Sequence, residues 1–199
     1  MPFYIPERYS IQVTTEPATE PVSLAEAKLQ CRVDGTEEND LITDLITAAR
    51  QQVEIDTSRT LITTVLKLRM DDFPPVIYLP RPALISVETV KYYNTAGTLT
   101  TMSASEYQVD LYSFPGCIVP APATSWPSVE TDRINAVEVA YTAGYGATAA
   151  SVPKALKRAI LMLVQEGYFR RADYEAQGFG SAGQAGYLSL VKPFALSMQ

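Results

Sequence analysis

Apolar and polar positions alternate with two different periods along this chain. From 21 to 57, and again from 153 to 177, apolar residues recur every three or four positions, the spacing of one helical face. From 60 to 142, short β-branched and aromatic runs alternate with polar residues between Pro and Gly turns. This order predicts an α+β fold. A helical bundle built from N- and C-terminal helices carries an inserted antiparallel β module, an extended N-terminal arm and a C-terminal tail.

The strongest helical pattern is a helix pair over residues 23–57. Ser23 and Glu26 have the spacing of a capping box, which predicts the start of a helix over 23–31. Gly35 is expected to end that helix, because glycine adopts the left-handed conformation at little cost. A second helix is predicted over 38–57. Its apolar face predicts a buried side, and its polar positions, Arg50 and Glu54 among them, fall on the opposite side.

A third helix is predicted over 153–177, starting in the sequence Ser151-Val-Pro-Lys. It is the most basic segment of the chain. Its ordinary interpretation is a solvated helix face, and a minority interpretation is contact with an acidic partner or with phosphates. The basic positions are Lys154, Lys157, Arg158, Arg170 and Arg171.

The β module is predicted over 60–142 as a meander of short strands that forms a small sandwich or barrel. Asn94-Thr-Ala-Gly97 is a hairpin turn, and Phe114-Pro-Gly116 turns the chain again. Trp126 has two interpretations, a recognition aromatic on the surface or a plug at the edge of the core, of which the second is commoner.

Both ends of the chain extend beyond this domain, which we place at 21–177. Residues 1–20 are expected to form an arm, within which Tyr9 to Val13 alternates and can add a strand. Residues 178–199 combine a glycine-rich run with an apolar end. One interpretation is a tether whose anchor adds to a neighbouring subunit or a partner. A C-terminal strand on the chain's own domain is nearly as well supported. The hinge glycines would be Gly178, Gly180, Gly183 and Gly186, and the anchors Tyr187, Leu188, Leu190, Val191, Phe194 and Leu196.

Composition argues against several classes of function. The net charge is −6, which disfavours a protein that wraps DNA, and the acidic positions of the helix pair argue against a DNA-binding helix-turn-helix. The 199 residues include no histidine and no convergent polar cluster, so we expect no catalysis, no metal and no cofactor. Cys31 and Cys117 are expected to be free thiols. We predict neither a secretory signal nor a membrane span.

Several short motifs, in this order and spacing, resemble the head–tail connector (adaptor, or head-completion) proteins of tailed bacteriophages. The resemblance covers about residues 21 to 170. No single motif is specific to this family, and the similarity rests on the order and spacing of the motifs together. The motifs are Pro21-Val-Ser-Leu-Ala-Glu-Ala-Lys, Arg32-Val-Asp-Gly, Asp40-Leu-Ile, Arg59-Thr-Leu-Ile62, Leu79-Pro-Arg-Pro, Leu84-Ile-Ser-Val, Tyr107-Gln-Val-Asp110, Ser125-Trp-Pro127, Ala143-Gly-Tyr-Gly146, Val152-Pro and Leu156-Lys-Arg-Ala-Ile-Leu.

The resemblance implies a structural virion protein, made in the host cytoplasm and placed at the head–tail interface. Such proteins form a ring under the portal, here about twelve copies by analogy, that extends the DNA channel. The implied partners are the portal protein and a stopper or tail-completion protein, and DNA passes without sequence-specific binding. The apolar tail would dock on the portal or a neighbour. The alternative is a small phage or host domain with a regulatory, protein-binding role and no catalysis.

Overall fold

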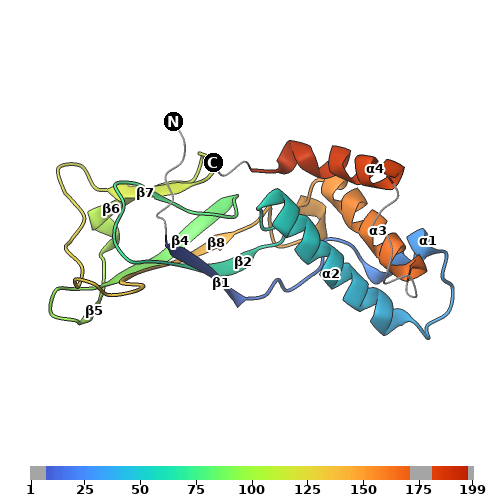
Figure 1. Cartoon of the computed structure of the whole chain (residues 1–199), viewed down its shortest axis with the longest axis horizontal. Coiled ribbons are helices and arrows are strands. Elements are labelled where there is room, and N and C mark those ends of the chain that lie inside the picture. Colours follow the sequence, from blue (N-terminus) through green and yellow to red (C-terminus); the bar gives the residue numbers. More distant parts are fainter. Residues whose placement is uncertain (1–7, 171–180, 197–199) are drawn as a thin grey trace. The chain divides into compact units, whose positions relative to one another are not determined.

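The computed structural model describes residues 8–170 and 181–196; residues 1–7, 171–180 and 197–199 lie outside the described part (Figure 1). Among the described residues, 18–62, 145–170 and 181–196 form a helical unit, and 8–17 and 63–144 form a β unit. Each unit has its own hydrophobic core. The combination of helices with antiparallel sheets confirms the predicted α+β class.

The helical unit contains α1 (Leu24–Cys31), α2 (Asn39–Thr57), α3 (Lys154–Phe169) and α4 (Ser181–Val191), with short 3-10 turns at Ala149–Ser151 and Lys192–Phe194. The capping box is present, since Ser23 accepts from the Glu26 N–H and the Glu26 carboxylate accepts from the Ser23 N–H. The first helix ends earlier than Gly35, at Arg32, which itself takes the left-handed conformation with φ 57°. Its N–H donates to backbone carbonyls of the last turn and closes the helix without glycine.

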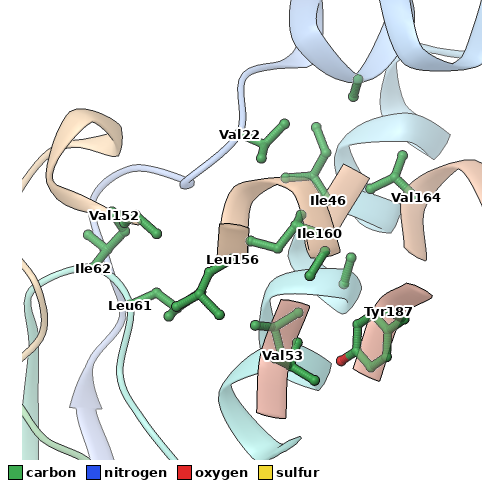
Figure 2. Close-up of a cluster of buried hydrophobic side chains, with 14 of the residues drawn as sticks. Val22, Ile46, Val53, Leu61, Ile62, Val152, Leu156, Ile160, Val164 and Tyr187 are labelled. Carbon is green, nitrogen blue, oxygen red and sulfur yellow. The ribbon is translucent and has the colours of Figure 1, made fainter. Parts of the chain in front are cut away.

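All four helices contribute to one core (Figure 2). Ile46 and Val53 of α2 meet Leu156, Ile160 and Val164 of α3, at the spacing that the sequence predicts for their apolar faces. Leu61 and Ile62, which the sequence places in the first strand of the β module, instead fill this helical core. Strand β2 begins at Thr64, two residues later, because the side chains of Leu61 and Ile62 are buried in the core of the helical unit.

Two corrections concern the C-terminal part of the helical unit. The third helix ends at Phe169 rather than at 177, and 171–177 lie outside the described residues. The predicted tail contains a helix, α4, and this helix packs along α3 (Figure 1). Its apolar positions are spaced for a helical face as well as for a strand, and only packing distinguishes the two.

The β unit consists of two antiparallel sheets (Figure 1). The five-stranded sheet has the order β1-β2-β8-β4-β5, and the three-stranded sheet has the order β3-β7-β6. This is not a simple meander, because β2 pairs with β8, more than sixty positions further along the chain. The strands are β1 (Tyr9–Thr15), β2 (Thr64–Met70), β3 (Ile77–Tyr78), β4 (Leu84–Tyr93), β5 (Leu99–Thr101), β6 (Tyr107–Asp110), β7 (Cys117–Pro120) and β8 (Val137–Ala143).

The alternation in the central strands sets the core of the β unit. In β2, Leu66, Leu68 and Met70 are buried, while Lys67 and Arg69 lie on the other face. On that outer face, Lys67 and Arg69 both pair with Glu138 of β8, at 2.9 and 3.3 Å. Burial alone would raise the pKa of Glu138, but these two cations hold it below its usual value.

The first described strand, β1, lies at the edge of the larger sheet. Tyr9 pairs with Met70 and Val13 with Leu66, so this part of the expected arm is a strand of the chain's own β unit. Ile11 and Val13 pack against the β core, which explains why this short alternating segment is ordered as a strand.

Candidate functional site

The candidate functional sites of this chain are surfaces that can contact other proteins. In the described residues, no group of three or more His, Cys, Asp or Glu side chains is placed to hold a metal ion. No helix within the described ranges is long and apolar enough to cross a bilayer. Three regions remain to be considered: the C-terminal helix, the basic positions of α3, and the loops at the two ends of the β unit.

The C-terminal helix is fixed to the chain's own helical unit. Tyr187 and Val191 are buried in the core, and Figure 2 shows the Tyr187 ring beside Val53 of α2. The Tyr187 hydroxyl donates to the Asp56 carboxylate. Burial, together with this hydrogen bond, raises the pKa of Tyr187. Two of the six predicted anchors therefore complete this chain's own core in this structure.

The segment after α4 is bound to the C-terminal end of α2. Arg59 Nε donates to the Phe194 carbonyl at 2.6 Å, and the Leu196 N–H donates to the Thr57 carbonyl at 3.2 Å. Leu190 and Phe194 are partly buried against the core. Leu188 differs from the other anchors in being 46% exposed, so it is free of the core and available to a partner.

Two of the four predicted hinge glycines lie in the described part of the chain, and two lie outside it. Gly178 and Gly180 lie outside the described residues, while Gly183 and Gly186 lie inside α4. A Cβ built on Gly186 would lie 3.5 Å from the Met162 methyl of α3, an ordinary contact distance. At both positions the chain is helical, and Gly186 also lies against α3, which is not the geometry of a hinge.

The basic positions of α3 are largely engaged within the helical unit. Lys157 Nζ lies 3.0 Å from Glu26 Oε1, Arg158 donates to Gln30, and Arg170 pairs with Glu166 one turn earlier. The Ser23 backbone N–H and Lys157 together lower the pKa of Glu26. Lys154 is exposed, and Arg171 lies outside the described residues. Two of the five cations, Lys157 and Arg158, join α3 to α1.

A groove lies at one end of the β unit, where β2 ends and β8 begins. Its floor is aromatic: Phe73 stacks on Trp126 with ring centroids 4.8 Å apart and planes 9° apart. Trp126 packs against the β core, so the interpretation as an edge plug holds, and its buried indole N–H finds no acceptor among the described residues. The cavity measures about 720 Å³. It is lined by Arg8, Asp71, Asp72, Phe73, Trp126, Pro127, Ser128, Val129, Glu130, Thr131, Asp132, Arg133 and Ile134.

At the other end of the β unit, the turn between β6 and β7 exposes apolar side chains. We call residues 111–114 the hairpin tip. Tyr112 is 92% exposed, and Leu111 and Phe114 are about half exposed. The Asp110 carboxylate accepts from the backbone N–H groups of Tyr112 and Ser113 and from the Ser113 hydroxyl. The hydroxyl bond, followed by the two N–H bonds, lowers the pKa of Asp110.

The sequence predicts a strand over 107–112 and a turn at Phe114-Pro-Gly116, whereas in the structure the strand ends at Asp110, so that Leu111 and Tyr112 belong to the turn. The signal was present, because Leu-Tyr-Ser-Phe places three large apolar residues where turns usually carry polar ones. Whether they face the core or solvent depends on how the two sheets pack, which the local pattern does not contain.

Comparison with known proteins shows which family part of the chain resembles. Residues 21–114, just under half of the chain, match the family model described as phage gp6-like head-tail connector protein. This part of the chain is similar to head–tail connectors. The match begins just before α1 and covers α1, α2 and the strands from β2 to β6. The match agrees with the resemblance to head–tail connectors that the order of the motifs indicated.

Solved structures agree on the fold. The neck of an empty GTA particle computed with C6 symmetry contains a chain that is 20% identical, with a TM-score of 0.76, covering 94% of this chain and 95% of that one. A chain in the virion of a native gene transfer agent particle is 21% identical with a TM-score of 0.74, covering 93% and 94%. A third, from the neck of a native GTA particle computed with C12 symmetry, is 19% identical with a TM-score of 0.67, covering 92% and 94%. No curated protein matches the sequence.

Proposed function

We propose that this connector assembles as a closed cyclic ring beneath the portal and continues the DNA channel toward the tail. The family match carries this proposal, because a protein that joins head to tail has to contact both. Chains of similar fold lie in neck structures computed with C6 and C12 symmetry, which supports cyclic assembly. The ring would hold about twelve copies through heterologous contacts, in which two different surfaces of each copy meet.

The partners follow from this position. One end of the ring binds the portal, and the other docks a stopper or tail-completion protein. The contacts are made by shape and apolar burial, without a catalytic step. Residues 21–177 form the connector domain in this proposal, and the C-terminal segment reaches the portal or a neighbouring copy through the part of it that the core leaves exposed.

The overall charge suits a channel for DNA. The chain carries a net charge of −6. A wall that is acidic overall does not bind phosphates tightly, so DNA slides past it without sequence-specific contacts. The basic side chains of α3 that pair with Glu26 and Glu166 contribute little free positive charge to oppose this.

Size-exclusion chromatography with light scattering tests the proposal. The purified chain is measured alone and then mixed with the portal protein of the same particle. We expect a monomer that joins the portal in one fixed, high ratio, because premature rings would compete with assembly. A small oligomer of fixed size that ignores the portal would contradict the proposal and favour a separate protein-binding domain.

A further inference from the structure

We propose that neighbouring copies in the ring are joined by their β units, with the hairpin tip of one copy seated in the aromatic groove of the next. This inference rests on the proposed ring. Two observations lead to it. One β unit carries both an exposed turn with a tyrosine at its end and a groove with an aromatic floor and a charged rim, and the same copy cannot use both together.

Contacts within the turn hold the hairpin tip in a fixed conformation. Three hydrogen bonds to the Asp110 carboxylate hold the turn from inside. At its base, Gly116 has no room for a side chain, since a Cβ there would lie 2.7 Å from a Leu84 methyl. A rigid turn loses little conformational entropy on binding, and exposed aromatic side chains are the groups that dominate interface energies. Tyr112 has the character of such an anchor.

The groove offers complementary chemistry. Its volume of about 720 Å³ lies within the range of ~300–1,000 Å³ typical of pockets that bury a drug-sized ligand, which suits a short turn better than a single side chain. The stacked rings of Phe73 and Trp126 give an apolar floor. Carboxylates at the rim can accept a tyrosine hydroxyl, and the exposed guanidinium of Arg8 can lie over its ring.

Tip and groove lie at opposite ends of the β unit. Gly116 lies against Leu84, which pairs with Ala143 at the end of β8. The groove residue Ile134 comes shortly before Val137, where β8 begins. The seven residues of β8 span about 23 Å at 3.3 Å per residue. One copy therefore cannot fill its own groove. A contact between opposite ends repeats from copy to copy, and it closes into a ring when the rotation allows.

Disulfide trapping tests this contact in the full-length chain. The native thiols are first removed by Cys31→Ala and Cys117→Ser, since Cys31 is buried and Cys117 is half-buried. Tyr112→Cys is then combined with Ser128→Cys in the groove, and rings assembled on the portal are oxidised. We expect a ladder of disulfide-linked multimers on a non-reducing gel. The matched control joins Tyr112→Cys to Thr15→Cys, an exposed position away from the groove, and should give no ladder.

The outcomes separate this inference from the ring itself. Rings that form on the portal but give no disulfide-linked ladder would overturn the proposed tip-and-groove contact, while the proposed ring assembly would still be supported. Crosslinking of the tip to the portal, in place of a ladder, would also overturn this contact, because it would show that the tip binds the portal rather than a neighbouring copy. If the unmodified chain forms no ring with the portal, the proposed function fails, and the inference fails with it.

Discussion

Arg50 and Glu54 are charged residues that the structure buries in the helical unit, although the helical pattern places them on the polar side of α2. Their side chains are only 5% and 8% exposed. Arg50 donates to Glu54 and to Glu20, each at 2.8 Å, and Glu54 also accepts from the Leu61 N–H. The network joins one helix to the segment before α1 and to the loop after α2. The helical period alone did not show that these two segments cover the polar side.

Removing Arg50 should strongly destabilise the protein. Arg50→Ala leaves the Glu54 carboxylate buried without its cation, and breaking one partner of a buried pair costs about 3–5 kcal/mol. The measurement is the free energy of unfolding from a urea titration at pH 7. Gln51→Ala, at the neighbouring exposed position, is the control and should change it by less than about 0.5 kcal/mol. Equal effects of the two substitutions would show that the network contributes nothing.

At the scale of elements, α4 is the largest departure from the sequence-based expectation. A glycine-rich run followed by apolar residues predicted a flexible tether. The structure makes a helix that covers the core, with Tyr187 and Val191 inside. Gly183 and Gly186 weaken the helix intrinsically, and burial of the apolar side chains offsets that loss. Removing the whole segment would therefore take away core residues, so truncation cannot isolate a binding role.

Two glycine substitutions distinguish a packed helix from a hinge. Gly186→Ala should stabilise the protein by about 0.5–1 kcal/mol, because alanine favours the helix and its Cβ would lie 3.5 Å from Met162. Gly167→Ala in α3 is the matched comparison. Its Cβ would lie 2.8 Å from a Leu45 methyl, so forced repacking, at about 1–3 kcal/mol, should outweigh the gain in helix propensity.

Thermal and urea unfolding of both variants provide the measurement, and assembly with the portal provides a second one. If Gly186 worked as a hinge, alanine there would impair assembly while raising stability. We expect assembly to be unchanged.

At the scale of the whole molecule, the chain forms two cores and leaves specific apolar side chains outside both. Leu188 on α4 and the hairpin tip are among the large apolar groups that neither core absorbs. In the proposed ring, such residues are the natural contacts, because interfaces draw their free energy from a few well-packed apolar anchors.

Leu188→Lys should leave folding intact and weaken assembly. The side chain is nearly half exposed, so its replacement costs the core little. A lysine in a packed apolar contact with the portal or a neighbour should lower affinity by about tenfold or more, equivalent to about 1.4 kcal/mol. Ser189→Lys, the adjacent exposed position, adds the same charge as a control. Light scattering of each variant mixed with the portal provides the comparison. Equal assembly of the two variants would show that Leu188 is not part of the interface.

The sequence by itself determined the fold class, the capped helix α1, the apolar faces of α2 and α3, and the alternation of β2 and β8, because each depends on contacts within a few residues. The order of motifs also indicated the connector family. The tertiary structure decided the rest. Pairing of β2 with β8, burial of Arg50, and the exposure of Tyr112 all depend on residues far apart in the chain. The conformation of the C-terminal segment also depends on distant residues, since its sequence pattern suits a strand, a tether or a helix. Only the core formed by α2 and α3 provides the apolar surface that selects the helix.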